Sequence, residues 1–425
     1  MTIKFIHTAD IHLGRPFSDL SMSDDKIELC NRACENAFNK IVELAIQKKV
    51  DFVLIAGDSF DDDEHDLSTK LLFINNLKKL ADDNIKSYII CGNHDPISMY
   101  KKYDSYFKFD EKYNGIINIV GVTTENSIAS FEEDEYIIHS VSFETNESKN
   151  QTVLLSPNSS GTKLNIGLMH CDLDKTESDY APCSREDLRK LNYNYYALGH
   201  IHIPSDNNEN IVYAGSPQGR TRKEIGAHGC WYIEAENNSI TNKEFLPVDC
   251  VRFKQLDIDC YDYKNKIDVF EAIDEQTNSS SDNSILNLFE INLIGITSAY
   301  EDLNTEDNLI EEYIENYNKI SDNIRVYKIN NETIPDINDT EILNDTGIIG
   351  LLANSFNNDS DINIDNIYDT VSDIHENIYK KLKLDNDTKT ILSSSLIEDK
   401  EEILKSVEQE LKSVCKEIYL TEENK

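Results

Sequence analysis

The sequence predicts an α/β protein with mixed β-sheets and helices on their outer faces. Apolar strand-like runs alternate with helical patterns over roughly the first 200 residues, and consecutive strands follow. This order is typical of sheets covered by helices. The 425 residues are 39% hydrophobic, with 21 Tyr and 15 Phe, which is enough for a large core. At roughly 100–200 residues per domain, the length predicts two or three domains.

Hydrophobic periodicity places the elements of the first part of the chain. Apolar positions at helical spacing predict helices over residues 25–48 and 67–80. A short helix over 184–191 is expected to begin at an N-cap, Ser184, with Asp187 three residues further on, close to a capping box. Short apolar runs predict strands at residues 3–7, 52–56, 87–90, 116–120, 136–143, 164–169, 195–198, 211–214 and 230–233.

Composition changes after about residue 246, which predicts domains over residues 1–246, 247–335 and 336–425. The middle domain is expected to be a small α+β cap, with a helix over residues 309–320 and a polar loop over 277–284. Its predicted strands are residues 251–260, 285–296 and 324–329. The last part is expected to be helical, with one apolar stripe formed by Ile397, Leu404, Val407, Leu411, Val414 and Ile418.

The charge and the cysteines of the sequence argue against several classes of protein. The chain has 41 basic and 79 acidic residues, a net charge of −38, which repels nucleic acids and anionic membranes at long range. Bound metal ions can still concentrate positive charge at one site. Nine scattered cysteines without a CxxC pair argue against a secreted disulfide scaffold. Because we also find no signal peptide and no membrane-spanning run, we expect a cytoplasmic protein without membrane contact.

Five short polar segments each follow a strand-like run. They are Asp10-Ile-His12, Gly57-Asp58, Gly92-Asn93-His94-Asp95, His170 and Gly199-His200-Ile-His202. In open α/β sheets, ligands bind at the carboxyl ends of strands, so these segments can converge on one rim. Carboxylate, imidazole and amide groups suit Mn, Fe or Zn. Seven or so ligands are too many for one ion, which favours a pair of ions sharing one carboxylate.

Each segment alone is weak evidence, because a single histidine is more often a core or surface residue than a ligand. All five in order, each at a strand end, are strong evidence. Side chains two apart on an extended chain point the same way, so Asp10 and His12 can share a face. Glycines directly before ligands permit tight backbone turns close to the metals.

These motifs resemble those of the calcineurin-like metallophosphoesterases. More narrowly, the segment 5–14 (FIHTADIHLG) resembles SbcD-type DNA repair nucleases, and the segments 57–61 (GDSFD) and 215–220 (GSPQGR) are most similar to their YhaO branch. The motifs cover roughly residues 1–235. The resemblance implies a four-layer αββα metallophosphoesterase sandwich with a small α+β cap domain and a helical C-terminal tail.

The resemblance also implies a role for each site residue. One metal would be held by Asp10, His12, Asp58 and His202, and the other by Asp58, Asn93, His170 and His200. Asp58 would therefore bridge the two ions, which the family predicts to be Mn²⁺, with Fe or Zn as alternatives. His94 would face the scissile phosphate without binding metal, and Asp95 would orient it by contacting it behind the site.

Basic residues near the motifs are candidates for holding the flanking phosphates. Arg15 follows the first motif, and Arg220, Arg222 and Lys223 follow the last strand of the domain. Ordinary surface charge is an equal alternative for each of them. One position departs from the SbcD-type pattern, since Asp61 stands where many members have a histidine. His65 is a candidate substitute, although we favour a solvated surface residue there.

The functional hypothesis is a Mn-dependent DNA exonuclease or endonuclease, the nuclease subunit of a DNA repair complex. The resemblance implies linear or broken DNA as substrate and an SbcC-like coiled-coil ATPase as partner, and it leaves a homodimer open. The apolar stripe of the tail would dock the ATPase, with packing on its own domain as the alternative. Two other functions stay open: a phosphodiesterase or phosphatase acting on a small or protein-borne phosphoester, and a non-catalytic scaffold subunit.

Overall fold

A computed structural model describes residues 2–15, 17, 26–61, 67–103, 105–158, 161–175, 177–206, 209–304 and 308–336. They fall into two compact units. Among the described residues, the first unit comprises those within Met1–Gln255, Ser280–Glu290 and Tyr317–Tyr327, and the second comprises those within Leu256–Ser279 and Ile291–Asn316 and those from Lys328 onward. The apolar stripe expected in the tail and the candidate His65 lie outside the described residues.

The first unit contains two six-stranded sheets. One has the order β12-β11-β1-β2-β3-β4, in which β1 to β4 run parallel, β11 is antiparallel to β1, and β12 is antiparallel to β11. Its central strands are buried on both faces, as continuous apolar runs such as β2 require. The strands are β1 (Ile3–Thr8), β2 (Phe52–Ala56), β3 (Lys86–Ile90), β4 (Ile117–Ile119), β11 (Gly229–Glu236) and β12 (Ser239–Pro247).

The second sheet has the order β5-β6-β7-β8-β10-β9. Its four inner strands are parallel, and the antiparallel strands β5 and β9 form the two edges. The strands are β5 (Ile128–Glu132), β6 (Tyr136–Val141), β7 (Leu164–His170), β8 (Tyr195–Gly199), β9 (Ser205–Asp206) and β10 (Ile211–Tyr213).

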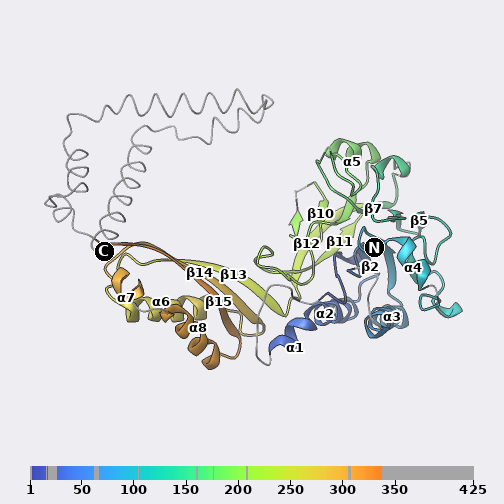
Figure 1. Cartoon of the computed structure of the whole chain (residues 1–425). Coiled ribbons are helices and arrows are strands. Elements are labelled where there is room, and N and C mark those ends of the chain that lie inside the picture. Colours follow the sequence, from blue (N-terminus) through green and yellow to red (C-terminus); the bar gives the residue numbers. More distant parts are fainter. Residues whose placement is uncertain are drawn as a thin grey trace, which may run out of the picture. The chain divides into compact units, whose positions relative to one another are not determined.

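Three apolar clusters hold four layers together. The cluster between the sheets joins residues such as Phe5 and Leu54 of the first sheet to Ile166 and Leu168 of the second. Helices α2 (Ala33–Lys48) and α3 (Leu67–Asp82) pack on the outer face of the first sheet, and α5 (Arg185–Leu191) packs on that of the second. Figure 1 shows α2 and α3 on one side of these strands and α5 on the other. The αββα arrangement confirms the predicted four-layer sandwich, and the helical tail predicted with it lies outside the described residues.

Short helices complete the first unit. Helix α1 (Lys26–Asn31) precedes α2, so the helix predicted over residues 25–48 is divided at Arg32. Helix α4 (Ile97–Lys102) follows β3, and two single-turn 3₁₀ helices, η1 (Glu111–Tyr113) and η2 (Thr152–Leu154), lie in connections. In the described part of the chain, we find no helix with the length and apolarity needed to cross a membrane.

A three-stranded sheet with the order β13-β14-β15 follows along the chain. It is accompanied by α6 (Lys266–Ser280), α7 (Tyr300–Asn304) and α8 (Leu309–Ile320), and its strands are β13 (Val251–Asp259), β14 (Leu286–Thr297) and β15 (Ile324–Pro335). The loop predicted over residues 277–284 is wrong in its first half, because α6 continues to Ser280. Thr277 Oγ1 donates to Ile273 O at 2.7 Å, so this polar side chain bonds to the preceding turn instead of ending the helix.

Candidate metal centre

All seven predicted metal ligands lie at the carboxyl ends of parallel strands. The residues after β1, β2 and β3 come from the first sheet, and those at the ends of β7 and β8 come from the second. Because the two sheets pack face to face, these ends meet at one edge of the sandwich. The side chains brought together there are Asp10, His12, Asp58, Asn93, His170, His200 and His202.

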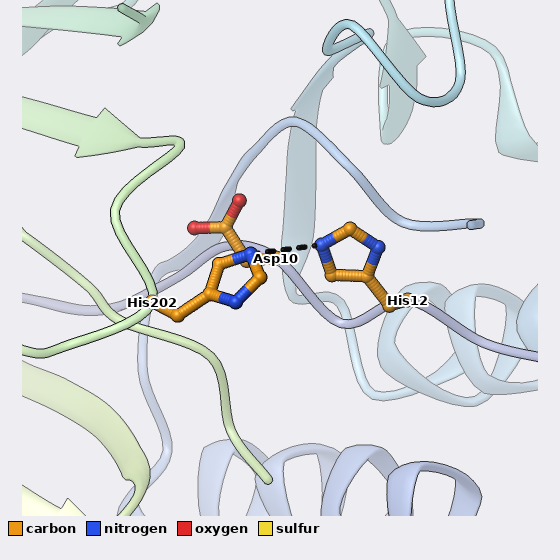
Figure 2. A group of neighbouring side chains, drawn as sticks. All are labelled: Asp10, His12 and His202. Carbon is orange, nitrogen blue, oxygen red and sulfur yellow. Dashed lines mark hydrogen bonds between the residues drawn. The ribbon is translucent and has the colours of Figure 1, made fainter. Parts of the chain in front are cut away.

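One group of ligands consists of Asp10, His12 and His202, with ligand atoms within 4.8 Å of one another. His12 and His202 are 190 residues apart in sequence, yet their Nε2 atoms are 3.2 Å apart. Figure 2 shows the two rings meeting beside the Asp10 carboxylate. Both Asp10 oxygens accept the backbone N–H of His200 at 3.1 Å, which ties the turn after β1 to the loop after β8.

The second group of ligands is centred on His170. Its Nε2 atom lies 2.9 Å from Asn93 Oδ1, which is 3.2 Å from His200 Nδ1. Asp58 connects this group to the first, because its Oδ2 atom lies 3.4 Å from His170 Nε2 and 3.8 Å from His12 Nε2. Asp58 therefore has the position that a carboxylate shared between two ions needs.

The backbone at the site is strained in order to place these side chains. Four ligand-bearing residues have positive φ: Asp10 (51°), His12 (48°), Asp58 (52°) and His200 (102°). Such values are uncommon outside glycine and cluster at functional sites. Hydrogen bonds between neighbouring turns hold them, including His12 N–H to Asp58 O at 3.0 Å.

Gly92 confirms the expectation that a glycine before a ligand allows a close approach. A Cβ atom at this position would lie 2.1 Å from Asp58 Oδ1, so any other residue would push against the shared carboxylate. Gly57, before Asp58, has φ +86°, a conformation that L side chains rarely adopt.

His94 faces the cluster from the turn after β3. Its backbone N–H donates to Asp58 Oδ1 at 2.9 Å, and its ring Nδ1 donates to the backbone carbonyl of Asp61 at 2.7 Å. The expectation that Asp95 contacts and orients His94 is therefore corrected. The Asp95 carboxylate is occupied by other donors, namely the N–H groups of Asp58, Ser59, Phe60 and Gly92 and the hydroxyl of Tyr100.

Burial and charge pairing move the pKa values of the ligands. Burial lowers the pKa of His12 to about 3, so this imidazole is neutral at physiological pH. Burial also opposes the cation of His170, but the nearby Asp58 carboxylate raises the pKa of His170 to about 9. Burial, together with repulsion from Asp58, raises the pKa of Asp10 above its ordinary value. Two buried carboxylates close together thus require positive charge between them.

The donor set fits a pair of divalent cations. Two facing Nε2 lone pairs 3.2 Å apart repel each other unless a cation or a proton lies between them. The seven side chains supply two carboxylates, four imidazoles and one amide oxygen, a mixture that suits Mn, Fe or Zn better than Ca or Mg. One ion would be held by the first group with Asp58, and the other by Asp58 with Asn93, His170 and His200.

Two of the three predicted phosphate-binding arginines lie beside the cluster. Arg15 Nη1 donates to Asp61 Oδ1 at 2.8 Å. Arg220 is buried, and its Nη1 atom lies 3.7 Å from the same carboxylate. Arg222 is exposed, as is the neighbouring Lys223. The Asp61 carboxylate also accepts from His12 Nδ1 at 2.9 Å, so it links a predicted ligand to the basic residues.

Two acidic residues behind the ligands were missed by sequence reasoning. Glu224 Oε1 lies 2.5 Å from His202 Nδ1, and Asp172 Oδ1 lies 3.4 Å from His200 Nε2. Ligating histidines usually donate their second ring N–H to a carboxylate or carbonyl. This rule predicts that such partners exist. Asp172 could have been predicted as such a partner, because it lies only two residues after His170. Glu224 could not, because only the folded loop brings it to His202.

In a comparison with known proteins, residues 3–204 match the family model described as calcineurin-like phosphoesterase. The protein named uncharacterized metallophosphoesterase YhaO of Bacillus subtilis is 28% identical over 283 residues, which cover 64% of this chain and 67% of that protein. DNA double-strand break repair protein Mre11 of Methanopyrus kandleri is 24% identical over 279 residues, covering 59% of this chain and 58% of that protein. The solved structure of a dimetal phosphatase from Danio rerio aligns with a TM-score of 0.33 at 11% identity, covering 54% of this chain and 92% of that chain.

Proposed function

Because residues 3–204 match the family model of the calcineurin-like phosphoesterases, we propose that this chain is a DNA nuclease that uses two divalent cations, Mn²⁺ in the first place. The observation that carries the proposal is the position of Asp58. One of its oxygens lies within 4 Å of a histidine from each ligand group, His12 and His170. Hydrolysis of phosphoesters by two ions sharing a carboxylate needs this arrangement.

The chain's own groups divide the remaining work. Bound divalent cations supply a water of lowered pKa and neutralise phosphate charge. Asp58 Oδ1 accepts a hydrogen bond from the backbone N–H of His94, and the backbone carbonyl of Asp61 accepts one from His94 Nδ1. These two bonds fix the position of the His94 ring. Because Nδ1 already donates to the Asp61 carbonyl, His94 can give a proton from Nε2 to the leaving sugar oxygen in its imidazolium form, in which both ring nitrogens are protonated. Arg15 lies at the exposed side of the site and is our candidate for gripping a flanking phosphate.

Two features support DNA as the substrate. One of the relatives is named as a DNA double-strand break repair protein and matches this chain over more than half of its length. The chain also continues beyond the matched domain with the β13-β14-β15 sheet and its helices. We further propose that an SbcC-like ATPase docks on the apolar stripe of residues 397–418 and brings DNA to the site, which offsets the net charge of −38.

A second candidate is a phosphodiesterase acting on a small or protein-borne phosphoester. Net acidity favours it, as does the acidic Asp61 beside the cluster. A single comparison separates the candidates. Purified protein with Mn²⁺ is given end-labelled linear duplex DNA and, in parallel, bis(p-nitrophenyl) phosphate, with EDTA and an Asp58→Ala variant as controls for contaminating nucleases.

The nuclease proposal expects Mn²⁺-dependent cleavage of both substrates, absent in EDTA and in the variant. Hydrolysis of the small diester alone would favour the second candidate. If neither substrate were cleaved at any Mn²⁺ concentration, the remaining function would be a non-catalytic scaffold subunit.

A further inference from the structure

Two ligand imidazoles have a carboxylate behind them. His12 Nδ1 lies 2.9 Å from Asp61 Oδ1, and His202 Nδ1 lies 2.5 Å from Glu224 Oε1. An ionised carboxylate only accepts hydrogen bonds, so each imidazole must donate from Nδ1. Arg220 Nη2 also faces His202 Nδ1, but at 3.4 Å it is farther away than Glu224 Oε1, so the carboxylate determines the tautomer. The lone pair of each neutral ring is then on Nε2, the atom that faces the other ring across 3.2 Å.

Glu224 is held more firmly than an ordinary surface carboxylate. Its side chain is buried, and its second oxygen, Oε2, accepts the backbone N–H of Arg220 at 2.6 Å and that of Thr221 at 2.9 Å. Each oxygen therefore has a separate task. Oε2 closes the turn that contains Arg220, and Oε1 faces His202.

Arg220 lies between the two carboxylates. Its side chain is 3% exposed, with Nη1 3.7 Å from Asp61 Oδ1 and Nη2 3.9 Å from Glu224 Oε1. Within the described residues, its Nε and Nη1 atoms have no hydrogen-bond partner. A buried guanidinium is stable beside opposite charge, so it favours the ionised, acceptor-only form of both carboxylates.

We propose that Glu224 is a positioning residue that fixes the tautomer of His202, and that Arg220 holds Glu224 and Asp61 behind the two imidazoles. The inference rests on the two-metal function proposed above, and it assigns Arg220 a task inside the protein in addition to any contact with phosphate. Partners of this kind typically change metal affinity by about 10–100-fold when they are lost.

The substitution Glu224→Gln tests the tautomer directly because it preserves size and shape. The amide has one acceptor oxygen, and the two backbone N–H groups of Arg220 and Thr221 require it. The amide NH₂ must then face His202 Nδ1 and donate to it. The imidazole responds by carrying its proton on Nε2, where the lone pair for the cation should be.

Asp61→Asn is the matched contrast. Asp61 Oδ1 accepts from both His12 and Arg15, and an amide oxygen can take the same place. This variant should therefore leave the tautomer of His12 unchanged while removing one negative charge. Glu209→Gln, in an exposed ion pair with Arg189, controls for the substitution itself.

The measurement combines two readouts on the full chain. Long-range ¹H–¹⁵N spectra of ¹⁵N-histidine protein, free of metal and at alkaline pH, report which ring nitrogen carries the proton. Zn²⁺ titration calorimetry reports affinity. We expect His202 to be protonated at Nδ1 in the wild type and at Nε2 in Glu224→Gln, with affinity for the weaker ion reduced about 10–100-fold in that variant and unchanged in Glu209→Gln.

Two outcomes would overturn the inference: an Nε2 proton on His202 in the wild type, which needs no variant to fold, or unchanged tautomer and affinity in Glu224→Gln. The result is independent of nuclease activity. A wild-type protein that binds Zn²⁺ with the expected tautomers but cleaves no DNA would refute the proposed function and leave this inference standing.

Discussion

Asp95 shows how one buried side chain can organise the centre without being a ligand. Its carboxylate accepts the backbone N–H of Ser59 at 2.8 Å and that of Gly92 at 2.7 Å, so it joins the turn after β2 to the turn after β3. Burial and the neighbouring Asp58 carboxylate raise the pKa of Asp95 to about 7. Asp95 therefore acts by fixing the two turns that carry Asp58 and Asn93.

Removing the His94 imidazole should slow catalysis without emptying the site. The ring bonds to a backbone carbonyl through Nδ1, so we expect His94→Ala to keep the metal content of the wild type. Loss of a general acid typically lowers the rate by a factor on the order of 10²–10⁴. Diester hydrolysis and metal analysis on the same preparation check both parts. Turnover close to wild type would exclude the acid role, and loss of both ions would make His94 a ligand.

His7 gives a prediction about pH and stability. This histidine is fully buried in β1, with Nδ1 3.0 Å from the Tyr195 hydroxyl, and burial lowers its pKa from 6.5 to about 3. As the pH falls below 6.5, the unfolded chain takes up a proton that the folded chain refuses. The contribution of neutral His7 to the free energy of unfolding is therefore fully present above pH 6.5. It is lost as the pH falls toward 3, by about 1.4 kcal/mol per pH unit.

The substitution His7→Phe removes this titration while keeping a ring against Tyr195. Between pH 7.5 and 5.5, the variant should lose about 1.4 kcal/mol less unfolding free energy than the wild type. Urea denaturation of both proteins in EDTA at the two pH values measures the difference. Parallel pH dependence in the two proteins would mean that His7 binds a proton equally well in the folded and the unfolded state.

Strands with a clear apolar pattern could be predicted, whereas strands with little hydrophobic signal, such as β5 and β12, could not. The strands β2 and β7 are buried at every position, so their sequences are distinctive. The edge strand β5 alternates between exposed and half-buried residues, and β12 is largely exposed, which leaves little hydrophobic signal in either. Helix α6 was missed because its last turn lies in a polar tract that predicts a loop. In the structure, the polar side chain of Thr277 bonds back to a carbonyl of the same helix.

The same distinction applies to the candidate site. The ligands could be predicted because their types and order are local to strand ends. The contacts of Glu224 and Asp95 behind the ligands could not, because their partners are set by loops that meet only in the fold. Glu224 reaches His202 across 22 positions, and the Asp95 carboxylate is used by turns that precede it by more than 30.

The N-terminus of α5 allows a test of an element predicted from sequence. The expected capping box is present, since Ser184 Oγ accepts the Asp187 N–H at 3.1 Å and Asp187 Oδ2 accepts the Ser184 N–H at 3.1 Å. Ser184→Ala should lower the free energy of unfolding by about 1 kcal/mol. Urea denaturation checks this against Ser239→Ala at the exposed start of β12. Equal stability of the two variants would show that the cap contributes nothing.

For the whole molecule, charge is the dominant property. The net charge of −38 is accompanied by pairing of the cations nearest the centre: Arg15 bonds to Asp61, and Lys175 lies 2.8 Å from Asp172. Little positive potential remains there to attract DNA before metal ions bind. A partner that delivers DNA is consistent with this charge distribution.

DNA binding by the isolated chain should therefore be weak and should involve few phosphates. Each phosphate neutralised contributes a slope of about −0.9 to the dependence of log affinity on log salt. Fluorescence anisotropy with the His94→Ala variant, which spares the DNA, measures this slope over a series of KCl concentrations. A steep slope like that of a strongly basic DNA-binding protein would contradict the expectation and would reveal a basic groove.

The central claim is that two ions share Asp58 at the edge where the two sheets meet. The most direct measurement is the number of Mn²⁺ ions bound per chain in the wild type, in Asp58→Ala and in Asp174→Ala, an exposed ion-pair control. Equilibrium dialysis followed by metal analysis gives this number. We predict two ions in the wild type and the control, and loss of most metal from Asp58→Ala, because the substitution removes a ligand from both ions. Two ions still bound per chain in Asp58→Ala would contradict the shared site.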